Sequence, residues 1–117
     1  MNIFHIAGKM IWENALSEGM YHPEDFYNDG FIHCSELDQI LYVANTFYSG
    51  RRDLVLLEID PHLVNFPIKY ESAVGSDDRF PHLYGSLMID AVVHVYVFKP
   101  DEEGGFRLSE ELSDSGA

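Results

Sequence analysis

The chain has 117 residues, which is enough for one domain with a single hydrophobic core. Hydrophobic residues make up 46% of it and charged residues 23%, a composition that is typical of a globular protein and excludes a disordered or fibrous chain. Twenty acidic side chains against seven basic ones give a formal net charge of −13, so duplex nucleic acid and anionic membranes are not expected partners.

The cysteine content and the termini indicate where the protein works. The single cysteine, Cys34, excludes an internal disulfide framework and favours a reducing compartment. The N-terminus lacks a basic stretch followed by a long apolar run, so we expect a cytoplasmic protein. We predict a single domain over residues 1–100, followed by an acidic segment, 101–117, with too little apolar content after residue 108 to pack and therefore expected to be mobile.

The N-terminal quarter predicts a strand, a helix and a loop. Residues 2–7 are rich in β-branched and aromatic side chains and favour a strand. Apolar residues recur at helical spacing over residues 9–18, and Gly19 follows where a left-handed cap is expected. Residues 21–30 are typical of a loop.

The next segment predicts a short strand and a second helix. Residues 30–34 form the strand, and helical periodicity continues over residues 36–48. Ser35 is the expected N-cap of this helix, with Asp38 completing a capping box.

The second half of the chain is dominated by strands. Residues 54–59 form a continuous apolar run that favours a central strand, and residues 68–73 alternate in polarity. A polar loop is expected over 74–81, the strongest strand over 91–98 and a small edge strand over 104–108. Because the strands gather late and do not alternate regularly with helices, the sequence predicts an α+β fold.

Histidine is where a functional site is most expected. The chain has no glycine-rich phosphate loop, nucleophile elbow or metalloprotease helix motif. It does have six histidines, and only histidine titrates near neutrality without help.

The first candidate pair is His33 and Ser35. On a strand, residues two positions apart share a face, so the two side chains point to the same side. An imidazole and a hydroxyl at this spacing can together bind a ribose or an amide. In the alternative, Ser35 only caps the next helix and His33 is a half-buried strand residue with a backbone partner.

The second candidate segment covers residues 77–85. Arg79 can pair with a phosphate and Tyr84 can stack on a base or a nicotinamide ring, with His82 between them in the sequence. In the structural alternative, the aromatic residues anchor a loop and Arg79 pairs with a neighbouring aspartate. Glu71 lies on the polar side of an alternating strand, where it is either a catalytic or a solvated carboxylate.

Metal binding and thiol chemistry are weaker alternatives. Four histidines in predicted strands or loops could share a transition metal: His5, His33, His82 and His94. No His-x-His or His-x₃-His spacing supports such a site, and we expect no metal. Cys34 faces away from His33 and is expected to be a small buried residue rather than a nucleophile.

Two blocks of residues together resemble a known family. They are Gly30-Phe31-Ile32-His33-Cys34-Ser35 and Phe80-Pro81-His82-Leu83-Tyr84-Gly85, accompanied by Trp12, Gln39 and Glu71. Over about residues 2–98 the chain resembles the small bacterial proteins of domain of unknown function 952. The resemblance implies the ADP-ribosyltransferase-like superfamily, with a split arrangement of small mixed sheets, two short helices and an NAD cleft between the sheets.

The resemblance also implies roles for individual residues. One group of that superfamily opens its NAD site with a histidine followed two positions later by serine or threonine. By resemblance, His33 would bind the adenosine ribose and Ser35 the nicotinamide ribose. Tyr84 is the closest candidate for the stacking tyrosine and Glu71 for the catalytic glutamate, although Glu71 precedes Tyr84 and the glutamate of that superfamily usually comes last.

These observations lead to two hypotheses. In the first, a cleft with His33, Ser35, Arg79, His82 and Tyr84 binds NAD or a related nucleotide, and Glu71 is the catalytic carboxylate of an ADP-ribosyltransferase-like enzyme that uses NAD as its substrate. In the second, the same fold is a non-enzymatic module that binds a small metabolite or a protein. The residues leave both the presence of catalysis and the oligomeric state open.

Overall fold

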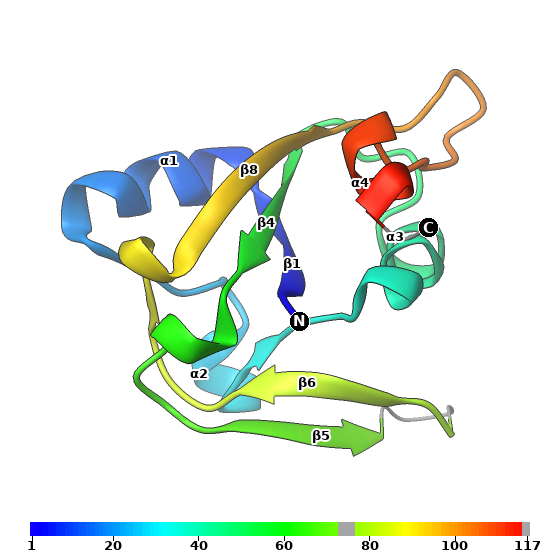
Figure 1. Ribbon diagram of the computed structural model, residues 1–117. Helices are drawn as coiled ribbons and strands as arrows, with labels where there is room; N and C mark the ends of the chain where they lie inside the picture. Colours follow the sequence, from blue (N-terminus) through cyan, green and yellow to red (C-terminus); the bar gives the residue numbers. More distant parts are fainter. Residues whose placement is uncertain (73–76, 116–117) are drawn as a thin grey trace.

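The structure, a computed structural model, describes residues 1–72 and 77–115. Within these residues the strands form three small sheets with the orders β1-β4-β8, β2-β7 and β3-β6-β5 (Figure 1). The predicted mixture of helices and small sheets is confirmed. The expectation of mixed sheets was wrong, since every strand pair in this part of the chain is antiparallel. Antiparallel pairs need no crossover helix, which leaves the helices free to pack on the sheet faces.

The first sheet is built around the apolar run of the sequence. β4 (Leu54–Ile59) lies between β1 (Ile3–Gly8) and β8 (Val92–Phe98). Five of its six residues are buried, which confirms the prediction of a central strand covered on both faces.

Helices cover both faces of this sheet. α1 (Lys9–Glu18) packs Trp12 against one face and ends at Gly19, whose φ of 83° is a left-handed conformation that glycine adopts without strain. α3 (Ile40–Phe47) and α4 (Glu110–Ser115) lie together on the other side (Figure 1). The sheet therefore has one apolar cluster on each face.

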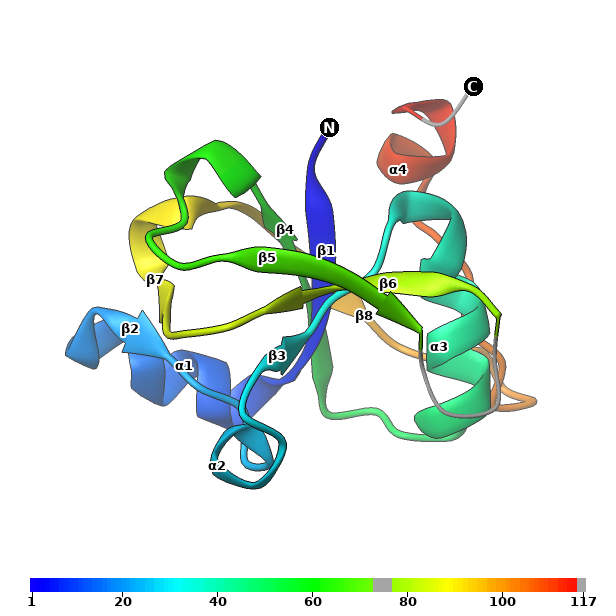
Figure 2. The same ribbon diagram turned by 90° about the horizontal axis from the view of Figure 1, so that it is seen from below.

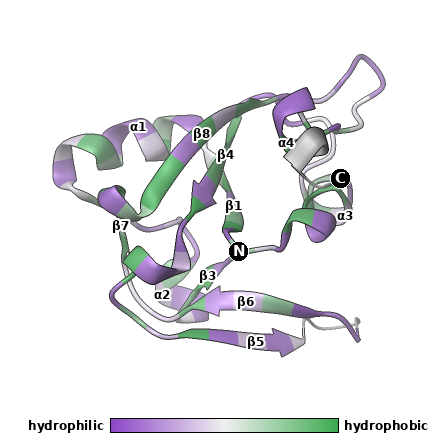
Figure 3. Ribbon diagram, viewed as in Figure 1, coloured by the Kyte–Doolittle hydropathy of each residue, from purple (hydrophilic) through white to green (hydrophobic). Residues whose placement is uncertain are grey.

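The second sheet lies across the lower end of the first. It consists of β3 (Ile32–His33), β6 (Arg79–Leu83) and β5 (Ile68–Ser72), and in Figure 2 it passes in front of β1. All residues of β6 after Arg79 are buried, and Figure 3 shows both hydrophilic and hydrophobic stretches along its ribbon. Phe80 and His82 share one face of the strand, and Pro81 and Leu83 share the other.

β6 replaces part of the loop that the sequence predicted, and Pro81 is the reason it was missed. Proline lacks an N–H and normally excludes a central strand. Here Pro81 faces β3, which is only two residues long, and its carbonyl accepts a hydrogen bond from Cys34 N at 3.0 Å. The hydrogen-bond ladder between β3 and β6 ends beside Pro81, so the N–H that proline lacks is not needed there.

Several short elements also differ from the sequence prediction. β2 (Met20–Tyr21) pairs with β7 (Leu87–Met88), and α2 (Phe26–Asp29) forms a single turn within the predicted loop. Residues 104–108 form no strand. Elements of one turn or one bridge have too few residues for a periodic pattern, which explains why the sequence did not predict them.

The cap of the second helix is shifted by one residue. Ser35 was expected to cap it, but the cap residue is Glu36, whose backbone N–H is bound by the Gln39 side chain at 2.9 Å. A short 3₁₀ turn, Leu37–Gln39, then leads into α3. Ser35 instead pairs through its backbone with Phe4.

The acidic C-terminal segment packs onto the domain in part. Phe106 stacks on Phe98 of β8, with ring centroids 4.8 Å apart, and Leu112 of α4 is buried in the same apolar cluster. The expectation that nothing after residue 108 packs was therefore wrong, because one buried leucine is enough to seat the short helix. No helix among the described residues is long and apolar enough to cross a membrane.

Candidate functional site

The candidate site lies where β3 meets the edge strand β1. Ser35 and Phe4 exchange two backbone hydrogen bonds, of 2.8 and 2.7 Å. One residue further along β1, the His5 ring bonds the carbonyl of His33 at 2.6 Å and the Tyr21 hydroxyl at 2.8 Å. These contacts hold the predicted pair of site residues against the first sheet.

His5 is a neutral structural histidine. Burial lowers its pKa from the usual 6.5 to about 4. A carbonyl only accepts hydrogen bonds, so we assign the proton to Nδ1, and Nε2 then accepts from Tyr21. His5 thus supports the site through the backbone of His33, while both of its own nitrogens are occupied.

A cavity of about 460 Å³ opens between β1, α3 and the strands β3 and β6. Its size is in the range of small-molecule sites. The wall combines aromatic rings with a few polar groups, among them Phe31, Phe47, Phe80, His33, Ser35 and His82. Two of the sequence segments singled out for function therefore open on one cavity.

The Ser35 hydroxyl is available to a ligand in this cavity. Ser35 is only 6% exposed, and the described residues provide no hydrogen-bond partner for its Oγ. No fully buried polar side-chain atom in this part of the chain lacks a partner. The hydroxyl oxygen is therefore partly accessible. Because Ser35 lines the cavity, we infer that its hydroxyl is accessible from there.

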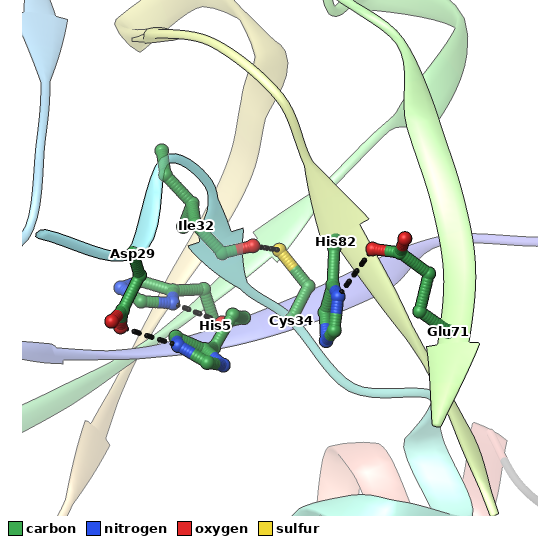
Figure 4. A network of polar contacts seen from close by, with 7 residues as sticks. His5, Asp29, Ile32, Cys34, Glu71 and His82 are labelled. Carbon is green, nitrogen blue, oxygen red and sulfur yellow. Dashed lines mark hydrogen bonds and ion pairs between the residues drawn. The ribbon is translucent and has the colours of Figure 1, made fainter. Parts of the chain in front are cut away.

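His82 is held by a carboxylate on the neighbouring strand. Its Nδ1 lies 2.8 Å from Glu71 Oε1, and the same oxygen accepts the Tyr84 hydroxyl at 2.5 Å. Figure 4 shows Glu71 on β5 directing its carboxylate toward His82 on β6. The contact joins residues 11 positions apart in the sequence, which the hairpin of β5 and β6 brings side by side.

The two hydrogen bonds set the charge of this group. The bond from Tyr84, followed by the bond from His82, lowers the pKa of Glu71, so the carboxylate is ionised at neutral pH. The same carboxylate raises the pKa of Tyr84, which keeps the phenol protonated. Lys69 Nζ lies 4.9 Å from the Tyr84 ring centroid, so a cation also covers the tyrosine.

An aromatic ring fixes the plane of the His82 imidazole. Phe31 stacks on it with a centroid separation of 4.1 Å and an angle of 17°. The His33 ring meets His82 edge-on at 5.5 Å. The residue before the first candidate pair is therefore also part of the site, although its aromatic type alone did not distinguish it from a core residue.

His33 sits at the exposed mouth of the cavity. Its Nε2 bonds Asp29 Oδ2 at 2.8 Å, and its side chain is 53% exposed. Asp25 lies nearby, and the ligand atoms of the three residues are within 4.8 Å of one another, close enough to share a cation. All three are exposed, and acidic groups commonly gather in this way without a metal.

A second cavity of about 410 Å³ adjoins the first. The two share Ile6, Asp25, His33 and Tyr48 in their walls. The second cavity also brings in the cations Lys9 and Arg51, with Arg51 bound to Asp53 at 2.9 and 3.1 Å. A ligand too long for one cavity has room in the other.

Comparison with known proteins gives the family of the chain. A family model described as protein of unknown function, DUF952, matches residues 6–95. The chain belongs to this family. The resemblance seen in the sequence is thereby confirmed at the level of the family, and the superfamily stays a prediction.

Solved structures support the fold of this DUF952 chain. The crystal structure of protein CC0527 from Caulobacter crescentus matches it with a TM-score of 0.86 and 29% identity, covering 97% of this chain and 99% of that one. A double mutant of CC0527 gives the same values. The solution structure of CC0527 matches with a TM-score of 0.80, also at 29% identity, over 94% and 95% of the two chains. No curated protein matches.

The DUF952 fold places the predicted site residues at different distances from the cavity. Ser35, His33 and His82 line it. Glu71 and Tyr84 do not line it: Glu71 is hydrogen-bonded to His82, and Tyr84 is hydrogen-bonded to Glu71.

The Arg79 side chain is not part of either cavity wall. Arg79 contributes its backbone carbonyl, which accepts the Gln39 amide at 2.8 Å and fastens the start of α3 to β6.

Cys34 is buried, as the sequence predicted. Burial raises the pKa of its thiol to about 12, so it carries no thiolate at neutral pH. Its Sγ donates a weak hydrogen bond to the Ile32 carbonyl (Figure 4). Although Cys34 borders the cavity, its protonated thiol is a poor nucleophile there.

Proposed function

We propose that the cavity binds NAD or a related nucleotide, and that this DUF952 chain is an ADP-ribosyltransferase-like protein. One observation carries the proposal: His33 and Ser35 open together on an aromatic-lined cavity, and the Ser35 hydroxyl has no partner among the described residues. The arrangement suits a ribose, whose hydroxyls need a donor and an acceptor side by side.

The dimensions of the two cavities suit the two halves of a dinucleotide. The first cavity has the volume for a nucleoside-sized group, with aromatic rings to cover a base or a nicotinamide ring. The second adjoins it and gives a longer ligand more room. Its wall holds Lys9 and Arg51 together with three acidic residues, Glu24, Asp25 and Asp53, and Arg51 is already bound to Asp53. The support from this cavity is therefore its size and position, not its charge.

In the catalytic form of the proposal, the bond between the ribose and nicotinamide breaks through an oxocarbenium-like state. A carboxylate near that centre stabilises the positive charge. Glu71 is the candidate, since its lowered pKa keeps it ionised. Arg79, His82 and Tyr84 remain predicted ligand contacts, with Arg79 the least favoured by its position.

Isothermal titration with NAD, ADP-ribose and nicotinamide tests the proposal. We expect micromolar binding of NAD and at least about tenfold weaker binding by His33→Ala, the loss expected for one or two hydrogen bonds. His62→Ala is the matched control, because His62 is an exposed histidine outside both cavities. Absence of heat with all three compounds, or equal affinities of the two variants, would contradict the proposal.

A non-enzymatic module is a second candidate, and the position of Glu71 favours it. Glu71 Oε1 already accepts two hydrogen bonds, and neither Glu71 nor Tyr84 lines the cavity. A carboxylate engaged in this way is less free to contact a ribosyl cation. NAD binding without any release of nicotinamide would support this module over the enzyme.

A further inference from the structure

We infer that His82 is the catalytic base of the cavity and that Glu71 is the positioning residue that fixes its tautomer. The inference rests on the proposed function and adds the residue that receives the proton of the acceptor. In this inference Glu71 acts on His82, and no longer directly on the substrate as in the catalytic form of the proposed function.

The tautomer follows from the partner of His82. An ionised carboxylate has no proton to donate, so the hydrogen between His82 Nδ1 and Glu71 Oε1 belongs to Nδ1. In the neutral ring Nε2 then carries the lone pair. This is the form of histidine that accepts a proton, and a carboxylate on the far nitrogen stabilises the imidazolium that results.

The free nitrogen faces the cavity. His82 is 6% exposed and lines the cavity, and no described residue bonds its Nε2. Because fully buried polar side-chain atoms in the described ranges all have partners, Nε2 must retain accessible surface. For a side chain so deeply placed, that surface belongs to the cavity in which the ligand is proposed to bind.

Two contacts hold the ring in this orientation. Phe31 covers one face of the imidazole at 4.1 Å, and Glu71 binds Nδ1, while Tyr84 donates to the same Glu71 oxygen and fixes the carboxylate. A base fixed in advance loses little entropy when it reacts. This series of contacts resembles the way in which an enzyme orients a general base. A carboxylate that was only solvated would not be expected to make both of these hydrogen bonds.

The two other histidines near the cavity are less suited to the role. Both nitrogens of His5 are already hydrogen-bonded. His33 is also bound to a carboxylate, but its own side chain is 53% exposed, against 7% for His82. His82 is the one that combines shielding from solvent, a fixed plane and a free Nε2.

The proposed step balances as a substitution at the ribose carbon that bears nicotinamide. The carbon–nitrogen bond breaks, and its electron pair leaves with neutral nicotinamide. An acceptor hydroxyl, water included, forms the new carbon–oxygen bond. Its proton moves to His82 Nε2 while Glu71 stays ionised and stabilises the imidazolium, and the proton then passes to solvent.

Imidazole NMR tests the tautomer without any ligand. At a pH high enough for the imidazole to be neutral, long-range ¹H–¹⁵N spectra of the wild type should show His82 with a protonated Nδ1 and an unprotonated Nε2. Glu71→Ala removes the acceptor and should abolish this preference. Glu58→Ala is the matched control, because Glu58 also accepts a tyrosine hydroxyl, from Tyr96 at 2.6 Å, but lies outside both cavities. A proton on Nε2 in the wild type would overturn the inference.

Nicotinamide release from NAD tests the chemical role, with binding measured on the same samples. At saturating NAD, we expect His82→Gln and Glu71→Gln to release nicotinamide at least about 100-fold more slowly than the wild type, the usual contribution of a general base. Glu58→Gln should match the wild type in both measurements. Folding of each variant is checked by its amide spectrum.

The outcomes separate the two proposals. If the wild type does not bind NAD, the proposed function fails, while the tautomer of His82 is still decided by NMR. If NAD binds and His82→Gln releases nicotinamide at the wild-type rate, the role of His82 as the base is overturned and NAD binding stands. Binding without release by the wild type also overturns the base and favours the non-enzymatic module.

Discussion

Mild acid should weaken the fold through one residue, His5. The ring is 5% exposed and is held neutral between the His33 carbonyl and the Tyr21 hydroxyl. Its pKa is lowered from 6.5 to about 4, chiefly by burial. Between these two values the unfolded chain binds a proton at this residue and the folded chain does not, so stability falls as the pH falls below 6.5 and the loss levels off near pH 4.

The size of the effect follows from the two pKa values. Lowering the pKa of His5 from 6.5 to about 4 corresponds to about 3 kcal/mol over the whole range, at roughly 1.4 kcal/mol per pH unit. Between pH 7 and pH 5 the loss from His5 alone is about 2 kcal/mol. This window lies above the ordinary range of carboxylates, so few other groups besides histidines change charge within it.

Urea unfolding at pH 7 and pH 5 measures this loss, with His5→Asn as the comparison. Asparagine can still donate to the His33 carbonyl but does not titrate. The other histidines titrate in both proteins and cancel from the difference. We expect the wild type to lose about 2 kcal/mol more than His5→Asn between the two pH values. Equal losses in the two proteins would refute the assignment of His5 as a buried neutral histidine.

Three further predictions concern the site and the C-terminal segment. Tyr84→Phe should raise the pKa of Glu71, since the hydroxyl is the main cause of its lowering, and a carboxyl ¹³C titration would show no change if the bond were absent in solution. Cys34 should resist iodoacetamide at pH 8 in the native protein and react after unfolding, because its thiol pKa is raised to about 12; rapid native labelling would show that it is not buried. Leu112→Ala should cost about 2–5 kcal/mol of unfolding free energy, whereas Leu16→Ala, at a 51% exposed leucine, should cost less than about 0.5 kcal/mol; similar losses would mean that α4 does not pack in solution.

Long patterns in the sequence predicted the main elements of the fold. The apolar run over 54–59 became the central strand, and the helical spacing over 9–18 became α1 with Gly19 as its cap. In each case the periodicity extends over six residues or more, so a single exception does not hide it. β6 was missed because Pro81 breaks such a pattern, and only the shortness of β3 makes that proline acceptable.

The candidate site was predictable in its residue types and less so in its geometry. Residue types singled out His33 and Ser35, and both line the cavity, but Cys34 between them lines it too, so strand alternation alone does not describe this segment. The bond between Glu71 and His82 depends on the register of β5 and β6, which no local pattern reveals. For the same reason, the sequence could not show that Arg79 offers only its carbonyl near the site.

The most direct test of the central claim is a titration of ¹⁵N-labelled protein with NAD, followed by amide chemical shifts. Binding in the cavity predicts saturable shifts that concentrate at residues 31–35, 43–48 and 80–82, which surround it. His33→Ala should reduce these shifts at the same NAD concentration. Absence of shifts at millimolar NAD, or shifts confined to the far strand β8, would contradict a nucleotide site between the two sheets.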